Sequence, residues 1–348
     1  MEHLKNEKEK IRRERRILAL LAAALFVCCL LSMTVGRYAV PVSRIPVLVK
    51  GYLMGSLEET DRAEATVLFV IRIPRILLAV LVGGALAVSG AVYQGLFQNP
   101  MVSPDILGVS SGASVGAALG LLLGLGFGWV HLFAFAAGTG AVLLVVSLAK
   151  IVGKGNSRIL LMVLAGTVIS SIFSSFTSLI KYVADTDEQL PAITFWLMGS
   201  FSKSGNAKNV WIMLAVFLVG VVPLFLIRWN LNALSFGEEE ARAMGVPVKR
   251  TRGIIIFCST LLTASSVCIC GTVGWVGLIM PHITRSLIGA NYRGLLPASM
   301  LAGGLFMLVV DNVSRVIIPG ELPIGILTSM IGAPLFIYLM FHGRKDWM

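Results

Sequence analysis

Long apolar runs alternate with short polar segments along almost the whole chain. Windows of about twenty apolar residues, the length that crosses a bilayer as a helix, predict ten membrane spans. The predicted spans are residues 17–36, 66–93, 106–126, 130–150, 158–181, 210–228, 253–272, 274–289, 296–314 and 323–341. The pattern therefore predicts an all-α polytopic membrane protein. A single transmembrane domain, residues 17–341, follows a basic arm of residues 1–16 and precedes a tail of residues 342–348.

Composition supports the membrane assignment. Of 348 residues, 56% are hydrophobic and 14% are charged, whereas soluble domains carry about 25% charged residues. The net charge of +11 would suggest nucleic-acid binding in a soluble protein. Here the charges lie between apolar runs, where they act as topology signals. The five cysteines all lie within apolar runs, so no disulfide framework is expected.

The distribution of Lys and Arg predicts the orientation. With an N-terminus inside, the cytoplasmic segments hold 19 of the 29 basic residues and the outer segments hold 10. Because cytoplasmic loops carry the excess of Lys and Arg, both termini are predicted to be cytoplasmic. The same parity places the polar segment before the seventh span inside the cell.

That polar segment carries the signals of a short helix. Ser235 precedes Glu238 by three residues, which is the spacing of a capping box at a helix start. The acidic residues that follow lie on the first turn, where the helix dipole favours them. Gly245 followed by Pro247 predicts the end. We therefore expect a capped helix over residues 235–245. A solvated surface helix is the alternative, but a complete start and stop favour a docking element for a soluble partner.

Glycine recurs every fourth residue through the third span. This spacing removes side chains from one face of the helix, so that another backbone can pack closely against it. A mobile helix is a second interpretation, because glycine weakens helices. The stripe consists of Gly108, Gly112, Gly116, Gly120, Gly124 and Gly128.

A faint internal repeat appears when the sequence is shifted by 181 residues. The matched positions lie in regions five spans apart, and an odd separation inverts a repeated unit in the membrane. The shift pairs Gly90 with Gly271, Val92 with Val273, Pro100 with Pro281, and Gly108 with Gly289. We therefore predict an inverted internal repeat.

The sequence predicts no catalytic residue and no metal site. No Walker A or His-Glu-x-x-His motif occurs, and the four histidines are scattered. Asp105 and Asp311 are the main candidates for membrane-embedded acids, which an ion-coupled carrier would need. Asp311 precedes Arg315 by four residues, so an ion pair on one helix face also accounts for it.

Three arginines stand at the expected outer ends of spans. Arg72 and Arg75 flank Pro74 at the entrance of the second span, and Arg315 ends the ninth. Such arginines snorkel to the interface in many membrane proteins. The functional alternative is a rim of cationic forks that engages carboxylates of an incoming protein.

Several motifs resemble the permeases of iron-siderophore and cobalamin ABC importers, the FecCD/BtuC type, over about residues 60–342. The residues that carry the resemblance are Arg72-Ile-Pro-Arg75, Gly84-Ala-Leu-Ala-Val-Ser-Gly90, Gln94, Asn99-Pro100, Pro104, Leu107-Gly108, Gly277-Leu-Ile-Met-Pro281-His282-Ile283, Arg285, Glu321-Leu-Pro-Ile-Gly325 and Gly332-Ala-Pro334.

The resemblance implies a type II ABC importer permease fold in a bacterial cell membrane. It implies a second permease subunit (a homodimer or a close paralogue), two cytoplasmic ATPase subunits that bind ATP and Mg, and an outer substrate-binding protein. No enzyme activity, cofactor or nucleic-acid partner is expected for the permease itself. Arg72, Arg75 and Arg315 correspond to arginines that receive the binding protein. The ATPase contact corresponds to Gly237, Glu238, Glu239, Glu240, Ala241, Arg242 and Gly245.

The expected cargo is an iron-siderophore-type chelate. Cobalamin, haem and molybdate stay open within the same family. An ion-coupled secondary carrier and an intramembrane enzyme are the rival classes.

Overall fold

Ten apolar helices dominate the part of the chain that the structure describes. This structure is a computed structural model, and it describes residues 2–36, 38, 40–153, 157–202 and 205–342. Within those residues, eight helical runs are long and apolar enough to cross a membrane, and two apolar helices are shorter. The apolar helices are α1 (Glu2–Thr34), α4 (Ile73–Leu96), α5 (Val109–Leu122), α6 (Phe127–Val152), α7 (Ser157–Val183), α9 (Ala207–Leu226), α12 (Val248–Cys270), α13 (Val276–Ile288), α14 (Tyr292–Ile317) and α15 (Ile324–His342).

The predicted ends of three spans differ from the observed ends. The second apolar run continues an earlier helical segment, which includes the π-helix Thr66–Arg72. The third and eighth runs give the short helices α5 and α13. α5 begins only after Gly108, which has a φ of +78°, and α13 ends at Gly289, which has a φ of +90°. Left-handed backbone favours glycine and breaks a helix at both positions.

α4 is the central helix of the bundle. It packs against α9, α12, α13 and α14, and nearly all its residues from Ile76 to Leu96 are buried. Its backbone comes so close to α13 that a Cβ on Gly90 would overlap the carbonyl of Gly277. Glycine is therefore required at this crossing, as expected where helices approach closely in lipid.

Close packing explains most of the glycine stripe. A Cβ on Gly112 or Gly116 would collide with backbone carbonyls of α6, and one on Gly120 would press against Val130 of α6. Gly108 instead precedes α5 and faces Ser170 of α7. Gly124 lies beyond the end of α5 in open space. The packing prediction is therefore confirmed for the three middle glycines, and the last two members of the stripe, Gly124 and Gly128, take no part.

The residues paired by the shift of 181 positions do not occupy equivalent places. Gly90 lies inside α4, whereas Gly271 is the residue at which α12 ends. Pro100 lies in a loop, whereas Pro281 is inside α13. This register is therefore wrong as a residue-by-residue equivalence, and an inverted repeat at the level of whole helices stays a prediction.

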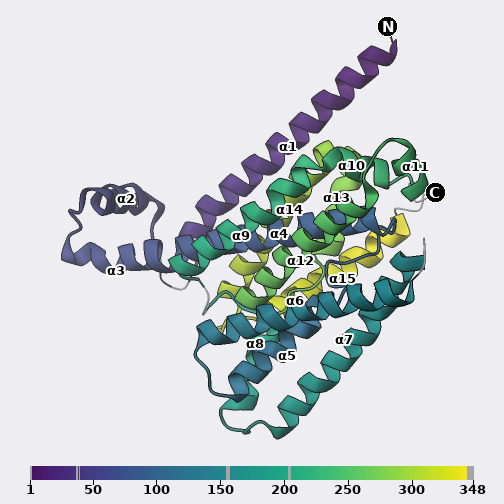
Figure 1. Cartoon of the computed structure of the whole chain (residues 1–348). Helices are drawn as coiled ribbons and strands as arrows, with labels where there is room; N and C mark the ends of the chain where they lie inside the picture. The colour runs from purple at the N-terminus through teal and green to yellow at the C-terminus, as the bar shows by residue number, and fades with distance from the viewer. Residues whose placement is uncertain (1, 37, 39, 154–156, 203–204, 343–348) are drawn as a thin grey trace.

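Short helices distinguish the two ends of the bundle (Figure 1). The beginning of α1, the end of α15 and the short helix α11 (Glu238–Ala243) lie toward one end, which we call the α11 end. At the opposite end, α2 (Ile45–Met54) and α3 (Arg62–Ala65) project sideways from the bundle. We call this the α2 end. The beginning of α1, the end of α15 and α11 thus lie at the same end of the bundle. The predicted topology, with both termini and the α11 segment on one side of the membrane, requires this arrangement.

The projecting unit has its own small core. Leu48 of α2 is buried against Leu68 of the π-helical segment. Arg44 forms ion pairs with Asp61 and with Glu64, the latter at 3.1 Å. Hydrogen bonds to these carboxylates raise the pKa of Arg44. α2 and α3 precede the motifs of the family resemblance, and the hydropathy pattern gave no prediction for residues 37–65.

Candidate functional site

α11 is a six-residue helix held between two glycines. Gly237 precedes it with a φ of +130°, and Gly245 follows with a φ of +80°. The Ala241 N–H donates to the carbonyl of Gly237 over 3.1 Å, and the Val246 N–H donates to the carbonyl of Ala241 over 2.9 Å. The left-handed stop at Gly245 is the one that the sequence predicts.

The predicted capping box is wrong. Ser235 ends the preceding helix, α10 (Arg228–Leu234), and its Oγ donates to the carbonyl of Asn232 over 2.6 Å. The helix is therefore Glu238–Ala243 rather than residues 235–245. The extended turn at Gly237 separates Ser235 from the helix start, so the capping contact cannot form.

Glu238 has different partners from those expected. Its carboxylate pairs with Arg242 at 3.2 Å on the same helix and with Arg252 of α12. Its neighbours Glu239 and Glu240 are exposed, and Ala241 is fully buried. One face of α11 is thus anchored in the protein, while an acidic face is open to a partner.

Hydrogen bonds connect the α10–α11 segment to the central helices. Gln98, just beyond the end of α4, donates from Nε2 to the carbonyl of Leu234 over 3.1 Å, and its backbone is left-handed with a φ of +49°. Asn232 donates to Asn291 over 3.1 Å, and its side-chain oxygen accepts the N–H of Tyr292 at the start of α14. With the Glu238–Arg252 pair, these contacts link the α10–α11 segment to α4, α12 and α14.

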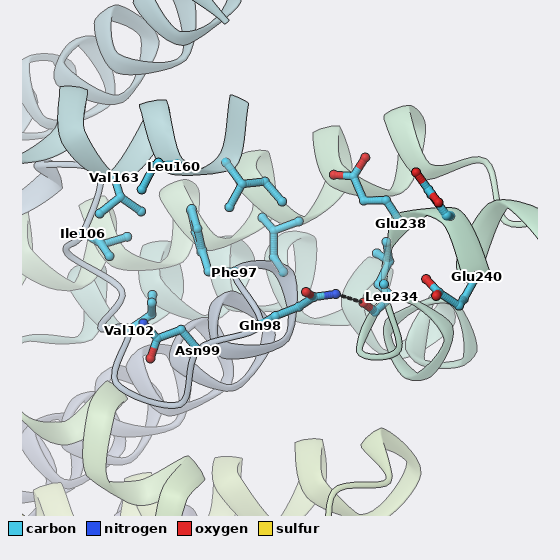
Figure 2. Close-up of a pocket in the computed structure, with 14 residues that line it drawn as sticks. Phe97, Gln98, Asn99, Val102, Ile106, Leu160, Val163, Leu234, Glu238 and Glu240 are labelled. Atoms are coloured by element: carbon cyan, nitrogen blue, oxygen red, sulfur yellow. Dashed lines mark hydrogen bonds between the residues drawn. The ribbon is translucent and has the colours of Figure 1, made fainter. Parts of the chain in front are cut away.

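A cleft of about 600 Å³ opens beside α11. Figure 2 shows Phe97, Gln98 and Val102 on one side of this cleft and Glu238 and Glu240 on the other. Its further walls come from Ile106 and from α7. Phe236 and Met244, at either end of α11, are exposed apolar side chains. Apolar flanks around an acidic turn suit a partner segment that carries both apolar and basic groups.

Two of the three predicted arginines, Arg75 and Arg315, form buried ion pairs at the α2 end. Arg75 binds both oxygens of Glu321 at 3.0 Å and binds Asp311 at 2.8 Å. Arg315 reaches the other oxygen of Asp311 at 3.2 Å and donates to the carbonyl of Val35 in the segment after α1.

All three arginines are buried, so they form no exposed rim of cationic forks in this structure, and docking of a binding protein at these residues stays a prediction. Arg72 and Arg75 are each 4% exposed and Arg315 is 7% exposed. Arg72 donates to the main-chain carbonyls of Met33 and Tyr38, so its guanidinium group also has internal partners. The ion pair between Asp311 and Arg315 is present as expected, but it belongs to a larger cluster. Its members are Arg75, Asp311, Arg315 and Glu321, which we call the arginine cluster.

A stripe of exposed hydroxyl groups on α7 was missed at the level of sequence. Its members lie on one helical face at intervals of three or four residues, which the sequence could have revealed. Most of these hydroxyls donate to a carbonyl of the preceding turn. The stripe consists of Thr167, Ser171, Ser174, Ser175 and Ser178. Such a face suits contact with water or cargo better than contact with lipid.

The remaining polar candidates have structural partners. Asp105 accepts the N–H of Ser110 over 2.6 Å at the start of α5. Asp311 lies in the arginine cluster. Among the described residues, no group of three or more His, Cys, Asp and Glu side chains could hold a metal ion. The five cysteines are unpaired thiols.

Known proteins resemble this chain in sequence and in fold. The FecCD transport family matches residues 24–342. The chain is 41% identical over 338 residues to the molybdate import system permease protein MolB of Haemophilus influenzae, covering 96% of this chain and 97% of that protein. It is 37% identical over 274 residues to the probable iron chelatin transport system permease protein of Helicobacter pylori, covering 79% and 82%.

A solved structure agrees over nearly the whole chain. It is an inward-facing conformation of a metal-chelate type ABC transporter, with a TM-score of 0.82 and 38% identity, covering 94% of this chain and 99% of that one. The relatives are permease subunits, which are transport components rather than ATPases. This chain therefore belongs to the FecCD transport family, as a multi-pass membrane permease of an ABC importer with the type II fold.

Proposed function

We propose that this permease imports an iron-siderophore-type chelate and that α11 receives a cytoplasmic ATPase subunit. The observation that carries the ATPase contact is the construction of α11: a short helix, anchored by Ala241, that presents exposed acidic groups beside a cleft. The excess of basic residues on the predicted inner side supports a cytoplasmic location of this end in a bacterial cell.

The links around α11 supply a route for coupling. An ATPase subunit that displaces α11 pulls on Gln98 at the end of α4 and on Asn232, which is bonded to the start of α14. The Glu238–Arg252 pair transmits the same displacement to α12. Rigid helices then carry the movement to the opposite end of the bundle, so that the transport pathway opens to alternate sides of the membrane.

The hydroxyl stripe on α7 is the candidate wall of the pathway. Two permease subunits, identical or closely related, would enclose the pathway between them, with one such stripe from each. Most of these hydroxyls already donate their protons within the helix, so the wall binds cargo weakly. Weak binding suits transport, because the cargo must leave as well as enter.

The α2 end would receive the substrate-binding protein. Arg75 holds Glu321 through two parallel hydrogen bonds, and the Glu321 side chain is 29% exposed at the edge of the arginine cluster. A carboxylate of the binding protein would replace Glu321 on Arg75. Docking through Arg72, Arg75 and Arg315 thus requires a local rearrangement rather than contact with a preformed rim.

Molybdate is the second candidate cargo. It is favoured by the 41% identity to the molybdate permease over 96% of this chain. The iron chelate is favoured by the iron chelatin relative and by the match to the metal-chelate type transporter.

Uptake in cells that express the complete transporter distinguishes the two cargoes. An iron chelate predicts accumulation of radioactive iron supplied as a siderophore complex, and excess molybdate should not compete. Accumulation of molybdate that is unaffected by the iron chelate would overturn the first candidate. Uptake that continues without ATPase subunits and follows an ion gradient would overturn the ATP-driven class.

A further inference from the structure

An apolar groove runs along the bundle between α6 and α12, away from the arginine cluster. It encloses about 650 Å³ and is lined mainly by aliphatic and aromatic side chains, with Met162 of α7 as part of its wall. Leu143 of α6 and Phe257 of α12, on its rim, are each 63% exposed. Exposed side chains of this kind on helices of membrane-spanning length are typical of a surface that contacts hydrocarbon.

Basic residues stand at one end of this groove. Lys150 lies in the last turn of α6, and Lys249 and Arg252 lie in the first turns of α12. Both lysines are exposed, whereas Arg252 also pairs with Glu238 of α11. With one carboxylate among these four charged groups, the end of the groove carries net positive charge.

The geometry of α12 adds to this positive field. Pro247 precedes the helix and provides no side-chain cap, and the positive end of the helix dipole lies at the same end of the groove. An apolar slot that ends in a basic mouth matches a molecule with a hydrocarbon tail and an anionic head. Basic pockets between membrane helices on the cytoplasmic side bind lipid head groups of this kind.

We propose that this groove binds one anionic phospholipid of the inner leaflet. One acyl chain occupies the slot between α6 and α12, and the phosphate lies between Lys150 and Lys249. The occupant touches Arg252, and through it Glu238, so the lipid borders the coupling segment without being part of it. The proposal concerns lipid binding and does not depend on which cargo is transported.

Gly253 supplies a selective way to fill the groove. It lines the slot, and a Cβ at this position would meet nothing within 4 Å. A side chain added here starts in open space, so Gly253→Leu should project into the space of the acyl chain. Gly140 of α6 is the matched control, because it also has open space around it but does not line the groove. Gly140→Leu adds the same side chain to a different face.

The experiment measures retained lipid and thermal stability of the purified complete transporter. Phosphatidylglycerol is the probe, with phosphatidylcholine and inorganic phosphate as comparisons. The wild type and Gly140→Leu should retain phosphatidylglycerol, and this lipid alone should raise their unfolding temperature. Gly253→Leu should lose both effects. Lys150→Gln or Lys249→Gln should each weaken phosphatidylglycerol binding about fivefold, whereas Lys208→Gln, at the α2 end, should not.

Three results would overturn the proposal. Gly253→Leu that retains as much phosphatidylglycerol as Gly140→Leu would show that the slot holds no acyl chain. If inorganic phosphate stabilises the protein as much as phosphatidylglycerol does, the groove binds an anion and not a lipid. Disulfide cross-linking of Phe257→Cys between two permease subunits would show that a second copy of the chain covers the groove.

Discussion

The arginine cluster and the α11 segment are both charged regions in an apolar protein, but their charges are used differently. In the cluster, Asp311 is fully buried and is shared between Arg75 and Arg315. On α11, Glu239 and Glu240 face outward. Burial makes each charge in the cluster depend on its partners, whereas exposure leaves the charges of α11 available to another protein. Whether a charged motif in a membrane protein is available to bind a partner can therefore be judged only when its burial is known.

The largest expected effect is at the centre of the cluster. Asp311→Ala leaves two arginines buried without their shared carboxylate and should destabilise the protein by about 3–5 kcal/mol. Unfolding of the purified protein in detergent by heat or denaturant measures the change. Glu239→Ala on α11 is the control and should shift the free energy of unfolding by less than about 0.5 kcal/mol. Equal shifts for the two variants would erase the distinction between the regions.

Proline within α11 should separate transport from folding. Ala241→Pro removes the N–H that bonds to Gly237 and should cost the local helix about 3 kcal/mol or more. We expect a chain that inserts normally but no longer transports, because the ATPase subunits are lost or uncoupled. Co-purification with the ATPase and uptake in cells are the measurements.

The control for this variant follows from the corrected helix start. Ser235→Ala removes a bond to Asn232 within α10 and should leave α11 and transport intact. Wild-type uptake by Ala241→Pro, with the ATPase retained, would show that α11 has no coupling role.

A smaller effect is expected at the link between α4 and α10. Gln98→Gly removes the bond to Leu234 but keeps the left-handed backbone acceptable, so the loss should be about 0.5–1.5 kcal/mol. If this bond transmits movement, the number of cargo molecules transported per ATP hydrolysed should fall although the ATPase still binds. An unchanged ratio in reconstituted vesicles would remove Gln98 from the coupling route.

The smallest effect should be that of Arg242→Ala. This side chain is 57% exposed and pairs with Glu238 four residues away, and exposed pairs contribute about 0–1 kcal/mol. Thermal unfolding should barely change, and Glu238 should keep its contact with Arg252. A loss of stability as large as that of Asp311→Ala would mean that α11 is part of the structural core.

Sequence predicted the regular features of the fold well. Twenty-residue apolar runs need no tertiary information, and Gly116 signals close packing because its neighbours in the stripe share its face. Gly245 likewise marks a helix end by its own conformational preference. These signals are local, which is why they could be read without the structure.

The misses involve partners far apart in the chain. Arg75 meets Asp311 across 236 positions, and no spacing rule reveals such a pair, so its burial could not be predicted. The Ser235–Glu238 spacing failed for the opposite reason. It satisfies a local rule, but the turn at Gly237 and the long-range attraction of Arg252 give Glu238 another partner.

α4 is fastened at both ends, by Arg75 within the arginine cluster and by the Gln98 bond beyond its last turn. Its 24 residues span about 36 Å. If a ligand at one end of this rod alters affinity at the other, thermodynamic reciprocity requires the reverse influence to have the same factor. Docking of a binding protein near Arg75 would then tighten or loosen the hold of the ATPase at α11 by as much as the ATPase alters the docking.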